Sequence, residues 1–285
     1  MKIAHLILAH KNPAQLKRLI NALKYPHFDI FIHLDKKADF KQFSHLISPG
    51  VSFIKKRAKI YWAGYGTIQG TLNGFEEILP LGYDYINVIS AQDFPIKPAS
   101  YIYEFLKKNK GKEFITCESI EDEWKEAATR VTDYHFINWQ IPGRDRLGKL
   151  LTSLLPRRKF PYQYKIVGRA NWFTLTTPAC QFILDFIHNN PRYVRYFKYC
   201  WGADEFFFST ILYNSNFKGN IERNLVYVEW PEQVNGHPNI LTSSEFERLK
   251  KTNLLFARKL DLERDDSLFK LLETWITDKT NFHPL

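Results

Sequence analysis

The most constraining feature of this sequence is the regular alternation of short apolar runs and amphipathic segments over its first half. The apolar runs have the length and composition of buried strands and cover Ile3–Leu8, Asp29–Leu34, Ser52–Ile54 and Tyr85–Ile89. Leucines at helical spacing follow Asn12 and Pro13, and a second amphipathic segment covers Thr67–Leu79. Strands that alternate with helices form parallel sheets with right-handed crossovers. We therefore expect an α/β fold with a mostly parallel central sheet flanked by helices.

The second half is less regular. An acidic stretch, Glu118–Glu123, and a basic stretch punctuated by proline, Arg144–Lys159, predict a long excursion over the face that carries the strand ends. Regular elements then return. We predict a strand over Asn171–Leu175, a helix over Pro178–His188, a second helix from near Asp204 and a last strand over Asn224–Trp230. Because no repeat, linker or low-complexity tract interrupts the chain, we expect one domain over residues 1–285.

Charge and aromatic content narrow the classes of partner. Forty Lys and Arg against thirty Asp and Glu give the 285 residues a formal charge of +10, which favours a polyanionic partner: nucleic acid, phosphate groups or an acidic membrane surface. Aromatic residues reach 16%, which fits either a large aromatic core or exposed rings that stack on sugars or bases. The length excludes peptide hormones, and the ordinary apolar and charged fractions exclude wholesale disorder.

Cysteine usage and hydropathy bear on the compartment. The cysteines Cys117, Cys180 and Cys200 cannot all pair and lack zinc-site spacing, so we expect free thiols in a reducing compartment. The first ten residues do not read as a signal peptide, and no run approaches the length of a membrane span. A cytoplasmic location, or a peripheral one at the inner face of the membrane, is the expectation. Leu150–Phe160 is either a basic amphipathic contact with anionic lipid or a core helix.

Several familiar catalytic signatures are missing from the sequence. It contains no Walker loop, no Gly-x-Gly-x-x-Gly, no Gly-x-Ser-x-Gly and no His-Glu-x-x-His. It also lacks Asp-x-Asp, and the second predicted strand ends instead in Asp35-Lys36-Lys37. A chain that handles a diphosphate without a metal-binding acidic pair needs lysine or arginine as the counter-charge.

A set of short blocks, in order along the chain, carries a resemblance to a known family. The blocks are Ala9–Pro13, Ile32–Lys37, Trp62–Gly64, Ile89–Lys97, Asp204–Thr210 and Leu255–Lys259. The sequence resembles the core-2/I-branching glycosyltransferases, glycosyltransferase family 14, which also contains peptide O-xylosyltransferases. Animal relatives carry a membrane anchor and disulfides, so the chain looks like a bacterial-type member.

The resemblance implies a GT-A-type fold and a reaction. A UDP-sugar donor would pass N-acetylglucosamine, or alternatively xylose, to a hydroxyl of a glycan or lipid-linked glycan, with inversion and without a metal ion or other cofactor. Residues 1–116 would form the nucleotide-binding half and residues 117–285 the acceptor and catalytic half. Inversion in one displacement needs a carboxylate to take the acceptor proton and cations to hold the departing diphosphate.

Glu205 is the predicted catalytic base because it matches the glutamate of the family block that begins at Asp204. The alternative is an ordinary acidic residue at a helix N-terminus, where the helix dipole favours it. We expect Asp204 to cap that helix rather than to react.

Lys259 matches the family lysine that contacts the donor diphosphate, and Arg258 precedes it. The alternative is a solvated basic helix end. The family brings a second cation to the diphosphate from an upstream arginine, but Asn239 stands in the comparable stretch here. Arg258 and Arg223 are therefore both candidates for the second cation.

Other donor contacts follow from the resemblance. Asp35 would accept hydrogen bonds from the nucleoside, with His10 and Lys37 beside it; the alternative for Asp35 is a turn residue. Asp93 would lie near the donor sugar, or else serve as a turn residue before a proline-stiffened loop.

Trp62 and Gly64 would shape the pocket, or else be a core tryptophan beside a turn glycine. On the acceptor side, Glu118 roughly matches a family glutamate that holds acceptor hydroxyls, although the basic residues that follow it in the family are Ile120–Glu123 here. Trp172 and Trp230 would stack on a sugar ring, or else lie in the core.

The prediction is thus an inverting, metal-independent glycosyltransferase with no nucleic-acid partner. Two other classes remain open. A nucleic-acid-binding protein would explain the charge and the aromatic residues, although no binding motif of that kind is recognisable. A carbohydrate-binding relative without catalysis would keep the fold and release no UDP.

Overall fold

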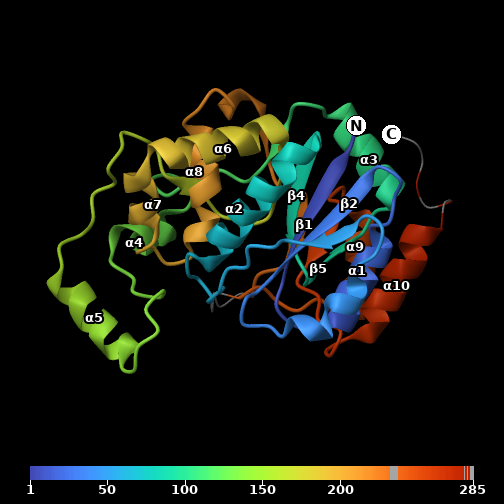
Figure 1. Ribbon diagram of the computed structural model, residues 1–285, viewed down its shortest axis with the longest axis horizontal. Coiled ribbons are helices and arrows are strands. Elements are labelled where there is room, and N and C mark those ends of the chain that lie inside the picture. The colour runs from blue at the N-terminus through green and yellow to red at the C-terminus, as the bar shows by residue number, and fades with distance from the viewer. Residues whose placement is uncertain (232–236, 279, 281, 283–285) are drawn as a thin grey trace.

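The computed structural model describes residues 1–231, 237–278, 280 and 282 (Figure 1). A seven-stranded sheet runs through the centre in the order β10-β6-β9-β4-β1-β2-β3. Its strands are β1 (Ile3–Ala9), β2 (Phe28–Leu34), β3 (Val51–Phe53), β4 (Tyr85–Ser90), β6 (Glu113–Phe114), β9 (Phe173–Thr176) and β10 (Ile221–Glu222). The neighbours β4-β1-β2-β3 are all parallel, whereas β9 is antiparallel to both β4 and β6. The predicted α/β class with a mostly parallel sheet is confirmed.

Helices cover both faces of this sheet (Figure 1). On one side α2 packs directly on β1 and β2, with α6 and α8 behind it. On the other side lie α1 and α10. The bounds are α1 (Pro13–Ala22), α2 (Gly66–Ile78), α3 (Ala99–Lys108), α4 (Ala128–Thr132), α5 (Arg144–Leu154), α6 (Thr177–Asn189), α7 (Pro191–Phe197), α8 (Phe207–Tyr213), α9 (Phe246–Lys251) and α10 (Asp266–Thr277). Asn12 caps α1, accepting a hydrogen bond from the Gln15 amide at 3.0 Å.

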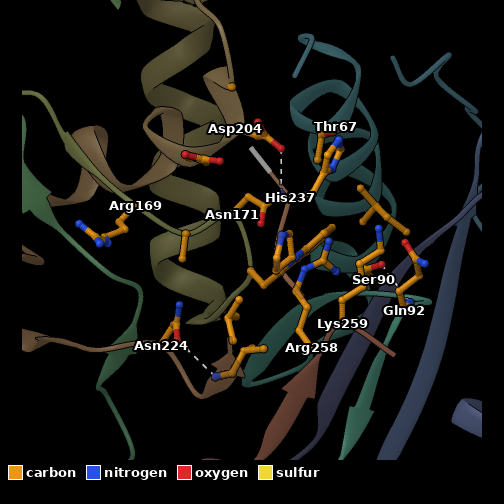
Figure 2. Close-up of a pocket in the computed structure, with 18 of the residues that line it drawn as sticks. Thr67, Ser90, Gln92, Arg169, Asn171, Asp204, Asn224, His237, Arg258 and Lys259 are labelled. Carbon is orange, nitrogen blue, oxygen red and sulfur yellow. Dashed lines mark hydrogen bonds between the residues drawn. The ribbon is translucent and has the colours of Figure 1, made fainter. Parts of the chain in front are cut away.

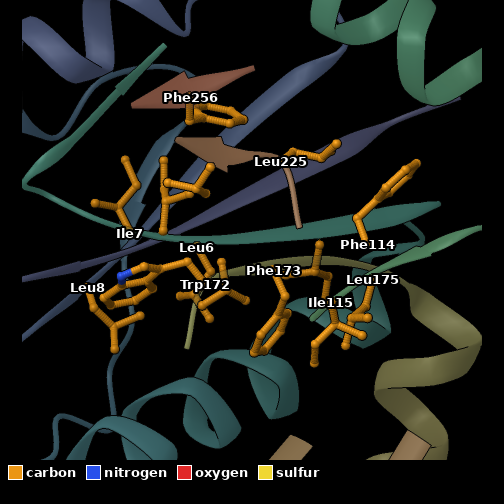
Figure 3. Close-up of a cluster of buried hydrophobic side chains, with 14 of the residues drawn as sticks. Leu6, Ile7, Leu8, Phe114, Ile115, Trp172, Phe173, Leu175, Leu225 and Phe256 are labelled. Carbon is orange, nitrogen blue, oxygen red and sulfur yellow. The ribbon is translucent and has the colours of Figure 1, made fainter. Parts of the chain in front are cut away.

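The core explains much of the aromatic content. Figure 3 shows Phe256 and Leu225 on one side of the central strands and Phe173 and Leu175 on the other. Every residue of β1 is buried, which is why its sequence is apolar without alternation. A larger set of fully buried rings comes from α2, α7 and the start of α8: Phe75, Tyr193, Phe197, Phe206, Phe207 and Phe208. An aromatic core, one of the two alternatives, therefore accounts for many of these rings.

Two short sheets bring distant segments to the end of the central sheet. β12 (Phe256–Arg258) pairs in parallel with β11 (Val226–Val228) and antiparallel with β5 (Asp93–Pro95), so that Arg258 lies opposite Asp93. In the other short sheet, β7 (Glu118–Ser119) pairs antiparallel with β8 (Val167–Gly168). Residues more than 150 positions apart thus meet at one edge.

Several predicted boundaries are corrected. The last predicted strand is shorter, since β11 covers only Val226–Val228. The helix predicted from near Asp204 begins at Phe207, after a 3-10 turn over Ala203–Glu205. α5 does not lie over the strand ends but stands out from one end of the molecule (Figure 1).

The single-domain assignment and the division at residue 116 stay predictions. Within residues 1–231 and 237–278, no helix is long and apolar enough to cross a bilayer.

Candidate functional site

A cavity of about 800 Å³ opens at the carboxyl ends of β1, β2 and β4, where ligands bind in open α/β sheets (Figure 2). Both halves of the chain line it. The predicted residues that line it are His10, Asp35, Lys37, Trp62, Glu118, Trp172, Glu205, Arg223, Trp230, Arg258 and Lys259. Two predicted residues, Gly64 and Asp93, do not line it. The proposed base and the proposed diphosphate cations therefore share one cavity.

The floor of the cavity is formed where β1 and β2 end. The Asp35 carboxylate accepts a hydrogen bond from the Lys37 amide at 2.9 Å and forms an ion pair with the Lys37 ammonium at 3.4 Å. Burial lowers the pKa of His10, and the nearby Lys11 lowers it further. The His10 imidazole is therefore neutral at pH 7 and can accept a hydrogen bond as well as donate one.

A cationic wall is formed by Arg258 and Lys259, which Figure 2 shows across the cavity from Asp204. The Arg258 guanidinium donates to the Asp93 carboxylate at 2.7 Å and lies 5.0 Å from the centroid of the Trp172 ring. Burial lowers the pKa of Lys259, and the charge of Arg258 lowers it further. Two adjacent cations facing a cavity fit a dianionic group such as a diphosphate.

Asp93 does not line the cavity, whereas Trp172 lines it with little exposed surface, and both side chains contact Arg258. The Asp93 side chain has no exposed surface, and its second oxygen accepts a hydrogen bond from the Ser90 amide at 2.7 Å. Asp93 is therefore the buried anchor of Arg258, and its place near the donor sugar stays a prediction. Trp172 is only 6% exposed, so the core alternative describes it better than a sugar-stacking platform.

Glu205 lines the same cavity and directly follows Asp204 in the chain. Its carboxylate accepts a hydrogen bond from the Arg130 guanidinium at 3.0 Å. Burial and the neighbouring Asp204 raise the pKa of Glu205 to about 8, against the opposing effect of Arg130 and Arg169. A carboxyl group that titrates near neutral pH is suited to exchange a proton with a substrate.

Asp204 does not cap a helix. The carboxylate accepts a hydrogen bond from the Asn171 side chain at 2.9 Å, and Gly202 occupies the position before the 3-10 turn. Burial raises the pKa of Asp204, although the hydrogen bond from Asn171 opposes this. The predicted capping role is wrong; Asp204 lines the cavity and adds negative charge beside Glu205.

The backbone around Glu205 is held by close contact with β8. The Arg169 amide donates to the Glu205 carbonyl at 3.2 Å. A Cβ atom on Gly168 would lie 2.2 Å from the same carbonyl oxygen, so the position requires glycine. This contact fixes the 3-10 turn that presents the carboxylate.

Glu118 is already held by two cations in this structure. Its carboxylate forms ion pairs with Arg169 at 2.9 Å and Arg223 at 3.4 Å. Arg223, a candidate second cation, therefore lies beside Glu118, whereas Arg258 lies beside Lys259. This arrangement favours Arg258 as the second diphosphate cation.

Exposed rings form part of the cavity wall. Trp62 is 56% exposed and Trp230 is 46% exposed, so both offer ring faces to a ligand. Trp62 also packs edge-on against Trp201 and stacks on His237, with centroids 5.1 and 4.6 Å apart. Gly64 lies in the turn behind Trp62, where a Cβ atom would lie 2.8 Å from the Asn138 side-chain oxygen. The turn alternative therefore describes Gly64.

Sequence reasoning missed Arg130, Arg169 and Asn171. Each gains its place through a partner far away along the chain, such as Glu205 for Arg130 at 3.0 Å. No local signal marks these residues, because an isolated arginine or asparagine is ordinary on any surface.

In the part of the chain that the structure describes, no group of three or more His, Cys, Asp or Glu side chains could hold a metal ion. Metal independence itself stays a prediction about the reaction.

Comparison with known proteins shows which family this chain belongs to. A model of the Core-2/I-Branching enzyme family matches residues 3–251. "Xylosyltransferase oxt" of Drosophila melanogaster is 23% identical to this chain over 299 residues, covering 92% of this chain and 32% of that protein. "Xylosyltransferase 2" of Homo sapiens is 23% identical over 303 residues, covering 96% and 33%. The chain thus spans about a third of the length of these curated relatives.

Among solved structures, a crystal structure of 4-diphosphocytidyl-2C-methyl-D-erythritol synthase superimposes with a TM-score of 0.33 at 14% identity, over 62% of this chain and 76% of that one. That likeness is too slight to bear on the fold. The family match extends from β1 into α9 and confirms the resemblance expected from the sequence. The chain belongs to the Core-2/I-Branching enzyme family.

Proposed function

We propose that this chain is an inverting glycosyltransferase that moves one sugar from a UDP-sugar to an acceptor hydroxyl without a metal ion. The observation that carries the proposal is the shared cavity, which is lined both by Glu205, a carboxyl group with a pKa of about 8, and by the cations Arg258 and Lys259. Family membership supports sugar transfer as the reaction.

In the proposed reaction, the ionised Glu205 carboxylate accepts the proton of the acceptor hydroxyl as that oxygen attacks the anomeric carbon. The bond between the anomeric carbon and the diphosphate oxygen breaks, and its electron pair leaves with the diphosphate. Arg258 and Lys259 stabilise the negative charge that develops there. One displacement from the face opposite the leaving group inverts the configuration.

The donor sugar has two candidates. The names of the relatives, both xylosyltransferases, favour xylose. The second candidate is N-acetylglucosamine, which the family resemblance of the sequence favours. The acceptor is a hydroxyl of a glycan or a lipid-linked glycan, with Trp62 and Trp230 offering exposed rings on which a sugar can stack.

The test is a thermal-shift screen followed by an activity assay. UDP should raise the unfolding midpoint more than GDP or CDP do, with or without a chelator, because a ligand stabilises the folded state according to its affinity. UDP-xylose and UDP-N-acetylglucosamine are then compared for UDP release in the presence of glycan acceptors.

The other two classes make different predictions in the same experiments. A carbohydrate-binding relative would bind sugars and release UDP from neither donor. A nucleic-acid-binding protein would show a steeply salt-dependent affinity for oligonucleotides that UDP does not reduce. Either result would replace the proposal.

A further inference from the structure

The helix α5 stands out from the end of the molecule formed by α4 and α7 (Figure 1). Leu147, Leu150 and Leu154 are three and four residues apart, so they share one face of this helix. All three are exposed, Leu150 at 55% and Leu154 at 72%. Leu155, just past the helix, adds to this surface. Contiguous exposed leucines on one helix face mark an interaction surface.

The opposite side of α5 is the one that contacts the rest of the chain. The Thr152 hydroxyl donates to the Tyr134 carbonyl at 2.6 Å. At Gly148, a Cβ atom would lie 3.7 Å from the Phe136 ring, an ordinary packing distance. The leucines therefore point outward because the helix is attached by its other side, not because the helix is loose.

Exposed basic side chains lie close to these leucines along the chain. Arg146 and Lys149 are exposed on α5 itself, and Lys159 is exposed shortly after it. Arg157 is 81% exposed and lies 4.0 Å from Asp133, an acidic residue at this end. The following segment is held on α7, where the Phe160 and Tyr196 ring centroids are 4.9 Å apart.

α7, which lies at the same end of the molecule as α5, adds the exposed residues Arg192 and Arg195. The combination of apolar and basic groups restricts the partner. A second copy of this chain would bring the same positive surface against itself, which costs free energy. A nucleic acid would satisfy the charges but would leave the leucines in water. An anionic bilayer satisfies both, because leucines enter the boundary of the acyl chains while lysine and arginine meet the headgroups.

We infer that the exposed face of α5, formed by Leu147, Leu150 and Leu154 with the basic residues around it, docks the protein on an anionic lipid bilayer. This surface is separate from the cavity that carries the proposed sugar transfer. The inference therefore stands or fails independently of that function.

The first test is flotation with vesicles. The wild-type protein should bind vesicles that contain about 30% phosphatidylglycerol at least about tenfold better than pure phosphatidylcholine vesicles. The double variant Leu150→Ser, Leu154→Ser should lose about tenfold or more of this binding. The control variant Leu81→Ser, Leu271→Ser removes two exposed leucines elsewhere, 55% and 38% exposed, and should bind like the wild type.

The second test separates the charges from the leucines. The variant Arg146→Gln, Lys149→Gln should weaken vesicle binding severalfold, and raising the salt from about 0.1 to about 0.5 M should do the same to the wild type. A polarity-sensitive dye on Leu150→Cys should shift to the blue on addition of phosphatidylglycerol vesicles. The same dye on Leu81→Cys should not shift.

Several results would overturn the inference. One is a wild-type protein that does not float with anionic vesicles, and another is a Leu150, Leu154 variant that floats as well as the wild type with an unchanged unfolding midpoint. RNA binding that depends on Arg146 and Lys149 but not on the leucines, without vesicle binding, would assign the surface to nucleic acid. A dimer that the leucine variant converts to a monomer would assign it to a second copy.

Discussion

Arg130 donates a hydrogen bond to the carboxylate of Glu205 at 3.0 Å, and its guanidinium lies 4.5 Å from the centroid of the Trp201 ring. Two opposing effects act on the pKa of Glu205, the proposed base. Burial favours the neutral carboxyl group of Glu205, while the charge of Arg130 favours the ionised form. The resulting pKa of about 8 leaves enough ionised Glu205 near neutral pH to accept a proton.

This balance predicts a pH profile. Glu205 must be ionised to act as a base, so kcat/KM should rise with pH and level off above about 8. Arg130→Gln removes a cation that lowers the pKa of Glu205, so the rise should move to higher pH. We expect about a tenfold loss at pH 7 that largely recovers near pH 9.

The control for this experiment is Arg223→Gln, because Arg223 pairs with Glu118 and not with Glu205. Its rise in kcat/KM should occur at the wild-type pH. A profile for Arg130→Gln that is lower at every pH, with no displacement, would show that Arg130 does not tune the base.

The ion pair between Asp93 and Arg258 makes a second prediction. Asp93→Asn keeps the size of the side chain but removes the buried negative charge that pairs with Arg258. We expect a loss of about 3 kcal/mol in the free energy of unfolding and a weaker affinity for UDP, measured by urea denaturation and calorimetry. Glu222→Gln, which removes an exposed pair with Lys112, should change stability by no more than about 0.5 kcal/mol. Equal effects of the two variants would contradict the anchoring role of Asp93.

A third prediction concerns Gly168. In Gly168→Ala the new methyl group meets the Glu205 carbonyl at 2.2 Å, so the backbone that presents the base must move. Stability should fall by about 2 kcal/mol, and kcat should fall more than donor affinity does. Gly148→Ala in α5 adds the same atom where the nearest neighbour is 3.7 Å away and should leave activity unchanged. Wild-type kcat in Gly168→Ala would mean that this contact does not position Glu205.

The fourth prediction concerns metals. If Arg258 and Lys259 supply the counter-charge for the diphosphate, sugar transfer should survive about 10 mM chelator with less than about a twofold change. Lys259→Met should then raise the donor KM and lower kcat. A strict requirement for manganese would mean that a metal ion, and not this pair, holds the leaving group.

The parts of the fold that could be predicted are those that have a local sequence pattern. β1 is buried on both faces and reads as a continuous apolar run, and Asn12 with Pro13 marks the start of α1. β9 could be recognised as a strand, but its antiparallel direction depends on where the preceding excursion returns the chain. The residues of β9 themselves contain no signal for its antiparallel direction.

The site divides in the same way. Glu205, Lys259 and Asp35 were found because each lies in a recognisable block, and all three line the cavity. Asp93 lies in such a block too, but its distance from the cavity is decided by the pairing of β5 with β12. Arg130 reaches Glu205 from the irregular excursion, so only the folded chain reveals it.

The most direct test of the central claim is Glu205→Gln, measured for both transfer and UDP binding. Glutamine keeps the size and can still accept a hydrogen bond from Arg130 but cannot take the acceptor proton. We predict a loss of about 1,000-fold in kcat with UDP affinity within about twofold of the wild type. Near-normal sugar transfer by this variant would contradict the assignment of Glu205 as the base.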